Sequence, residues 1–382
     1  SRGLGDVYKR QVNGGDNWHR VAGTPSVAFR DIKLQRRDSD LVGASFGRGF
    51  YVLDDYSALR SMADNGFDGS TSLFPIRDAW WYIPSAPSQA IGMPTLGSDS
   101  FKTPNPDFGA TITYYLDQKY RTSKVKRKAE EDTLSEKGES IPFPGWQRLT
   151  AESLEAAPRV MVLIRDNQGR SVRWLEAKNE EGTHRITWDL RLSAPDAVDL
   201  STPEFVPPWA GPSQGPLAAP GSYTAQLYAL TQGQAAPLAE PQSFNVIPVR
   251  SAASGIDYTE VAGYQQQTAE LMLKVNHAGE ELKRTAGLLR HMKAAAISAP
   301  RAEASLFTSL DDFGAKLDRL KARLNGDPVR GRLNESSVPS ISARTYNAAN
   351  TWQTTQMATA TQLSDFDIAK EDFEAFSTDL NA

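Results

Sequence analysis

The hydrophobic period of this chain changes at Asp257, and that change limits its architecture more than any other feature. Before Asp257, short segments alternate between apolar and polar residues, a pattern typical of half-buried β-strands. After it, apolar residues recur at spacings of three and four, as they do on one face of an α-helix. The 382-residue chain is long enough for several hydrophobic cores. The sequence therefore predicts a multidomain fold that is mainly β and then α.

The β region contains strand patterns separated by turn residues. Residues 110–116 place Ile112, Tyr114 and Leu116 on one face of an expected strand. Further strands are expected at residues 159–165, 172–175, 184–192, 223–229 and 244–249. Short strands at such spacing predict an antiparallel sandwich over residues 73–250.

A long helix is expected from Asp257, which can form a capping box with Glu260. Its apolar seam has two polar positions, Thr268 and Thr285, and the helix breaks at Ala299-Pro300.

Three more helices are predicted after this break. The second ends at Asn325-Gly326, a weaker one spans residues 341–359, and a fourth opens at Ser364 with Asp367. We expect three or four of these helices to pack as an antiparallel helical bundle over residues 255–382.

The segment from Asp40 to Asp55, DLVGASFGRGFYVLDD, has the pattern of the last strands of a β-propeller blade. Upstream, Gly14 to Trp18 resemble the end of an Asp-box turn, a folding motif whose Trp packs between sheets. Gln11, Asn13 and Asn17 depart from that motif at its Ser, Asp and Thr positions.

Together these segments resemble the closing blade of bacterial sortilin-like, BNR-repeat (Asp-box) propeller proteins, which are often labelled glycosyl hydrolases. The resemblance continues through Leu73-Phe74-Pro75, Ile186-Thr187-Trp188-Asp189-Leu190-Arg191 and Pro220-Gly221-Ser222-Tyr223-Thr224. It implies that residues 12–72 are the last blade of a truncated propeller and that residues 73–250 form an immunoglobulin-like sandwich. It also implies that upstream blades of a parent chain are partners, and that the location is extracellular or periplasmic.

Residues 1–11, SRGLGDVYKRQ, fit none of these patterns. We expect them to be an artefact of sequence assembly, and the chain to be a fragment of a longer protein.

Composition excludes several classes of function. The net charge of −4 argues against a nucleic-acid or anionic-membrane surface, and no apolar run is long enough for a membrane span. With no cysteine, the chain has no disulfides, zinc–thiolate sites or thiol nucleophiles. Its four histidines lack ligand spacing, so no metal or other cofactor is expected.

No catalytic residues can be assigned from the sequence. Arg48 and Tyr51 are of a suitable type for a sialidase site, but packing or a salt bridge explains them better. Glycosidases need two carboxylates at a defined separation, and Asp54 and Asp55 are sequence neighbours that would cap a turn.

Two Pro-rich segments offer aromatic residues for partner binding. Trp146 lies in a Pro-flanked loop of a charged insertion, residues 119–157. We expect this insertion to be solvated and partly helical. Trp209 lies in a second Pro-rich excursion, residues 195–219. Either Trp could bind a protein or glycan, or pack on its own domain.

The sequence favours a non-catalytic accessory or scaffold region of an exported propeller protein that supports protein or glycan binding. The alternative is the C-terminal part of a glycoside hydrolase or peptidase whose catalytic residues lie in upstream blades. A further hypothesis is that the helical region drives assembly.

Overall fold

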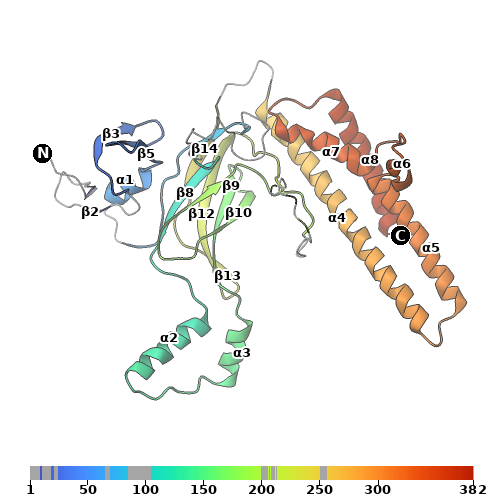
Figure 1. Ribbon diagram of the computed structural model, residues 1–382, viewed down its shortest axis with the longest axis horizontal. Coiled ribbons are helices and arrows are strands. Elements are labelled where there is room, and N and C mark those ends of the chain that lie inside the picture. Colours follow the sequence, from blue (N-terminus) through green and yellow to red (C-terminus); the bar gives the residue numbers. More distant parts are fainter. Residues whose placement is uncertain are drawn as a thin grey trace. The chain divides into compact units, whose positions relative to one another are not determined.

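The computed structural model describes residues 9–10, 19–20, 25–64, 69–84, 105–198, 205, 207, 211, 213–249 and 256–381 (Figure 1). The chain forms two compact units, described separately below. The β unit comprises residues 1–81, 101–189 and 221–247, and the helical unit comprises residues 82–100, 190–220 and 248–382. The expected order of a mainly β region followed by a mainly α region is confirmed.

The strands of the β unit form several sheets, in which the pairs among β8 to β14 are antiparallel. One sheet has the order β10-β9-β12-β14-β7, with β13 paired to β12, and a second has the order β11-β8-β6. The strands are β6 (Ser72–Leu73), β7 (Ala79–Trp81), β8 (Ala110–Leu116), β9 (Arg159–Asp166), β10 (Ser171–Ala177), β11 (Gly182–Trp188), β12 (Gly221–Thr231), β13 (Gln234–Pro237) and β14 (Gln242–Pro248).

Side chains from these two sheets meet in one core. The Trp188 ring of β11 contacts Tyr223 of β12 and Phe244 of β14, with centroids 5.1 and 6.1 Å apart. The expected inward face of β8 is confirmed, because Ile112, Tyr114 and Leu116 are fully buried. Alternation along each strand thus produces the core.

One predicted strand is shorter than expected. The strand expected at residues 184–192 ends at Trp188, and Leu190 then takes a positive φ of 55°. Gly109 permits a close approach at this point, because a Cβ on it would lie 1.8 Å from the Trp188 carbonyl oxygen.

A third sheet precedes these strands. It consists of β3 (Phe29–Gln35), β4 (Asp40–Ser45) and β5 (Phe50–Leu53) in the order β3-β4-β5. A short pair, β1 (Lys9–Arg10) and β2 (His19–Arg20), lies before it in sequence. The proposed Asp-box residues 14–18 lie outside the described residues.

Two arginines connect the third sheet to the rest of the β unit. Arg185 of β11 donates to the carbonyl oxygens of Asp54 and Asp55, at 2.8 and 2.5 Å. Arg77 donates to the Asp38 carbonyl oxygen at 2.6 Å and lies 3.7 Å from the Asp40 carboxylate. These polar contacts connect the third sheet to strand β11 and to the segment before β7.

The insertion in the β unit is a helical hairpin, which confirms the expected partly helical segment. It consists of α2 (Ser123–Glu136) and α3 (Trp146–Leu154), which lie side by side in Figure 1. The remaining helix of this unit is α1 (Ser57–Asp64).

The helical unit is built on α4 (Tyr258–Ser298). Asp257 is confirmed as the N-cap of α4, but it accepts its hydrogen bond from the Thr259 backbone N–H, at 2.8 Å, and not from Glu260 of the expected capping box. The other helices are α5 (Ala304–Asn325), α6 (Pro328–Arg332), α7 (Ile341–Ala349), the 3₁₀ turn η1 (Asn350–Gln353) and α8 (Ala360–Asn381).

Leucine and phenylalanine side chains from α4, α5 and α8 form the core of this unit. Leu282, Leu324 and Phe376 are at most 1% exposed. Two predicted boundaries were wrong: the helix expected at 341–359 ends at Ala349, and the fourth helix begins at Ala360 rather than Ser364. The sequence prediction also missed α6, which Asp327 caps.

Candidate functional site

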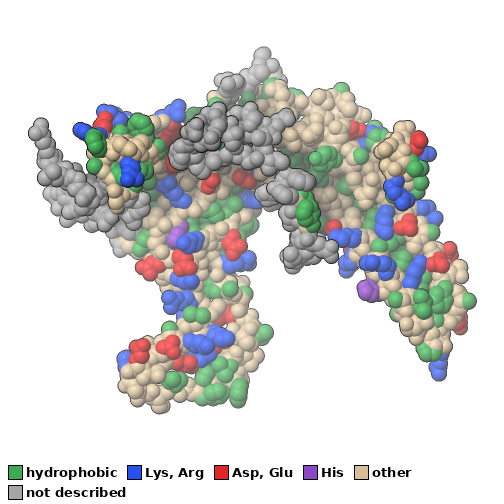
Figure 2. All heavy atoms as spheres, viewed as in Figure 1, with side chains coloured by type: hydrophobic (Ala, Val, Ile, Leu, Met, Phe, Trp, Pro, Cys, Tyr) green, Lys and Arg blue, Asp and Glu red, His purple; other side chains and the backbone are tan. Residues whose placement is uncertain are grey.

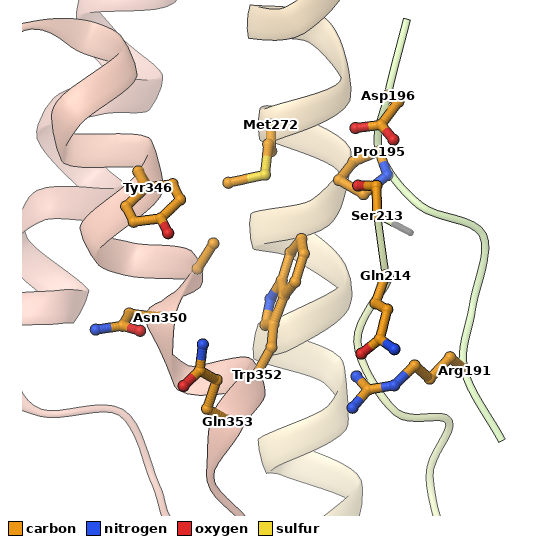
Figure 3. A pocket seen from close by; sticks show the side chains of 11 residues that line it. Arg191, Pro195, Asp196, Ser213, Gln214, Met272, Tyr346, Asn350, Trp352 and Gln353 are labelled. Atoms are coloured by element: carbon orange, nitrogen blue, oxygen red, sulfur yellow. The ribbon is translucent and has the colours of Figure 1, made fainter. Parts of the chain in front are cut away.

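The helical unit contains a pocket of about 250 Å³, which we call the Trp352 pocket (Figure 3). It lies between the α4 and α7–η1 helices on one side and two loop segments on the other. Its lining residues are Arg191, Pro195, Asp196, Ser213, Gln214, Met272, Tyr346, Ala349, Asn350, Trp352 and Gln353.

The loop wall is a short antiparallel ladder. The Leu192 N–H donates to the Pro216 carbonyl oxygen at 2.9 Å, and the Ala218 N–H donates to the Leu190 carbonyl oxygen at 2.7 Å. The Arg191 guanidinium donates to the Gly215 carbonyl oxygen at 2.8 Å.

Gly215 allows the two segments of this wall to approach closely. A Cβ on Gly215 would lie 2.4 Å from the Leu192 carbonyl oxygen and 2.5 Å from that of Ser193. Such distances are well inside van der Waals contact, so a larger residue would force the segments apart.

The loop wall is also attached to α4. The Asn276 side-chain amide donates to the Pro195 carbonyl oxygen at 2.7 Å, and Pro195 is buried. This bond satisfies a carbonyl group that would otherwise lose its contact with water.

The opposite wall is fixed by a buried polar network between α4 and η1. Trp352 donates its indole N–H to the Thr268 hydroxyl at 2.9 Å, and Thr268 is fully buried. The Gln265 amide, also buried, donates to the carbonyl oxygens of Thr351 and Thr354 at 2.8 and 3.2 Å. The polar Thr268 in the apolar seam of α4 is therefore explained, because its hydroxyl fixes the orientation of the Trp352 ring.

The lining combines aromatic, amide and charged groups. Figure 3 shows Tyr346, Asn350 and Gln353 on the helical side of Trp352, and Gln214 and Arg191 on the loop side. Carboxamides both donate and accept hydrogen bonds. Such a lining can bind a polar ligand with apolar faces.

None of the sequence candidates that the structure describes lines this pocket: Arg48, Tyr51 and Trp146 belong to the β unit. Arg48 is exposed in the turn between β4 and β5, where Gly47 and Gly49 both have positive φ. Tyr51 lies on β5, and its ring contacts that of Phe29 at a centroid distance of 5.5 Å. These neighbours are consistent with a packing role for Tyr51.

Asp54 and Asp55 follow β5. The Asp55 carboxylate accepts from the Ser57 N–H at 3.1 Å, which confirms that it caps the following turn. Burial, and then repulsion from Asp40, raise the pKa of the Asp54 carboxyl. Side-chain contacts of this pair therefore support local structure.

Trp146 is the first residue of α3 and is 76% exposed. Its ring meets the Phe143 ring edge to face, with centroids 5.2 Å apart. Figure 2 shows hydrophobic side chains gathered at the end of the hairpin where the chain enters α3. Trp209 lies outside the described residues.

Ion pairs between α2 and α3 hold in place the helix that begins with Trp146. Arg127 of α2 donates to the Glu152 carboxylate of α3 at 2.8 to 3.0 Å and also pairs with Glu131. Glu152 is buried and also pairs with Arg148. The hydrogen bond from Arg127 lowers the pKa of the Glu152 carboxyl.

Two other site types find no support in the described part of the chain. Those residues contain no group of three or more His, Asp or Glu side chains placed to hold a metal ion. No helix among them is both long and apolar enough to cross a membrane.

The sequence does not reveal the Trp352 pocket, because its loop wall and its α7–η1 wall are more than 130 residues apart in the chain. Two signals pointed toward it: the polar Thr268 in the α4 seam and the polar and aromatic run Asn350-Thr351-Trp352-Gln353.

Comparison with known proteins gave no match to a family model, a curated protein or a solved structure.

Proposed function

We propose that this chain is a non-catalytic accessory region of an exported, sortilin-like BNR-repeat propeller protein and that it supports protein or glycan binding. In this proposal the β3-β4-β5 sheet is a closing propeller blade, and the β10-β9-β12-β14-β7 sheet forms an immunoglobulin-like sandwich with the β11-β8-β6 sheet. The helices α4, α5, α7 and α8 form an antiparallel bundle.

The observation that carries the proposal is that the β3-β4-β5 sheet has exposed apolar residues on both faces. Ile32 and Leu34 lie on one face and are 50 and 53% exposed. Phe50 and Val52 lie on the other and are 78 and 54% exposed. A sheet in a soluble domain normally has at least one solvated polar face.

A propeller blade has this property because a neighbouring blade covers each of its faces. Fully burying an aliphatic or phenylalanine side chain contributes roughly 1.5–3 kcal/mol. Four partly exposed side chains of this kind therefore favour neighbours on both faces.

Substitutions on the two faces test this proposal. Ile32→Lys and Val52→Lys should change the stability of the present chain by less than about 0.5 kcal/mol, because both positions are already half exposed. In a longer protein that supplies the neighbouring blades of this proposal, each should destabilise the sheet by about 1–3 kcal/mol, measured by denaturant unfolding.

Arg36→Gln, in the exposed turn between β3 and β4 and on neither face of the sheet, is the control and should be neutral in both proteins. If Ile32→Lys and Val52→Lys leave the free energy of unfolding of the longer protein unchanged, the blade assignment is wrong. Turnover of a panel of glycosides and peptides by the present chain would contradict the non-catalytic part and favour a hydrolase.

A further inference from the structure

We propose that the Trp352 pocket binds one neutral sugar ring. This inference deepens the proposed function and rests on its binding role, and it assigns that role to a specific site. The ligand class follows from the size, charge and lining of the pocket.

The size of the pocket limits the ligand. Its volume of about 250 Å³ lies below the roughly 300–1,000 Å³ range of pockets that enclose drug-sized molecules. A ligand of about one substituted six-membered ring, or one terminal unit of a longer chain, fits this volume.

The hydrogen-bonding groups match hydroxyl groups. Three carboxamides line the pocket, from Gln214, Asn350 and Gln353. Each offers two donors and an acceptor, and a sugar hydroxyl is itself both donor and acceptor. Adjacent hydroxyls on a ring can therefore pair with one amide through both its N–H and its C=O.

The charge of the lining favours a neutral ligand. Arg191 supplies one positive charge and Asp196 one negative charge. The Arg191 guanidinium already donates to the Gly215 carbonyl oxygen, so part of its donor capacity belongs to the loop wall. The Asp196 carboxylate would repel an anionic ligand, and Arg191, the one cation among the lining residues, already bonds to the loop wall.

The aromatic groups provide the apolar contact that a sugar ring needs on its C–H faces. The Trp352 indole is held in orientation by Thr268, which limits the side-chain entropy lost when a ligand binds. Tyr346 is 71% exposed, so a ligand covering its ring would remove apolar surface from water. Figure 3 shows both rings beside the same space.

The test uses the full chain and ligand-observed saturation-transfer NMR. The probes are the methyl glycosides of glucose, galactose, mannose and N-acetylglucosamine, with methyl glucuronide as an anionic ring and cyclohexanol as an apolar ring. At least one neutral glycoside should bind and should outcompete the other two probes.

Gln214→Ala and Gln353→Ala should each weaken that binding about two- to tenfold, the effect of losing one hydrogen bond. Both side chains are exposed, so the fold should be kept. Gln356→Ala removes an exposed amide that does not line the pocket and should leave the affinity unchanged.

The inference is overturned if no neutral glycoside binds, if only the glucuronide or cyclohexanol binds, or if the Gln214→Ala, Gln353→Ala double variant keeps full affinity. None of these outcomes bears on the blade assignment, which is decided separately by the Ile32 and Val52 variants.

Discussion

At the scale of single residues, the Trp352 pocket depends on two residues that do not line it. Gly215 lets the two loop segments of its wall touch, and Thr268 sets the orientation of the Trp352 indole. Both act through geometry: a missing Cβ in one case and a buried hydroxyl in the other. Residues of this kind are recognised by their contacts rather than by their chemical type.

Gly215→Ala should open the loop wall, because its new methyl group would overlap the Leu192 and Ser193 carbonyl oxygens. We expect faster amide exchange at Leu192 and Ala218, measured by hydrogen exchange, and weaker binding of any ligand of the pocket. Gly211→Ala is the matched control, since a Cβ there meets nothing within 4 Å. Equal exchange in the two variants would contradict this role for Gly215.

At the scale of elements, the α2–α3 hairpin shows how a charged insertion becomes ordered. Neither helix buries a hydrophobic residue, and Glu152 is the one buried side chain of the pair among their described residues. The ion pairs with Arg127 and Arg148 therefore take the place of a hydrophobic seam. The stability of the hairpin should therefore depend strongly on whether Glu152 is protonated.

The stability of the hairpin should fall in acid. The pKa of Glu152 is lowered in the folded state, so its contribution is complete above the unfolded value of about 4.3 and disappears as pH falls through the folded pKa. Protection of residues 123–154 from hydrogen exchange, corrected for intrinsic rates, should therefore decrease between pH 6 and pH 3.

Glu152→Gln should lower this protection at pH 7 and remove its dependence on pH. Glu130→Gln, at an exposed position of α2, should behave like the parent chain. A pH dependence that survives in Glu152→Gln would assign the effect to other carboxylates.

At the scale of the whole molecule, each compact unit has a core of its own. The β unit packs Trp188 of the β11-β8-β6 sheet against Tyr223 and Phe244 of its six-stranded sheet, and the helical unit packs Leu282, Leu324 and Phe376 between its helices. Large-to-small changes in each core should therefore be felt first in the unit that contains them.

Trp188→Ala should cost about 3–5 kcal/mol and Leu324→Ala about 2–5 kcal/mol, because both side chains are fully buried. Hydrogen exchange should place the largest loss of protection in β8–β14 for the first variant and in α4–α8 for the second. Trp146→Ala, at a 76% exposed position, should stay within about 0.5 kcal/mol of the parent chain. If Trp188→Ala instead lost protection mainly in α4–α8, or Leu324→Ala mainly in β8–β14, the two units would not have separate cores.

The sequence by itself determined the features that depend on local periodicity and capping. It predicted the change from strands to helices at Asp257, the inward face of β8 and the break before α5, because near neighbours along the chain decide side-chain direction and caps. It failed at the end of α7, where η1 replaces the expected helix so that Thr351 and Thr354 carbonyl oxygens meet the distant Gln265.

Only the tertiary structure decided the candidate site. The loop wall around Gly215, the α4 residue Thr268 and the η1 residue Trp352 are far apart in sequence, and no local pattern encodes their meeting. Their arrangement depends on which hydrogen bonds and van der Waals contacts the folded chain can satisfy at once. These pairings arise between distant segments, so they exist only when the helical unit is packed.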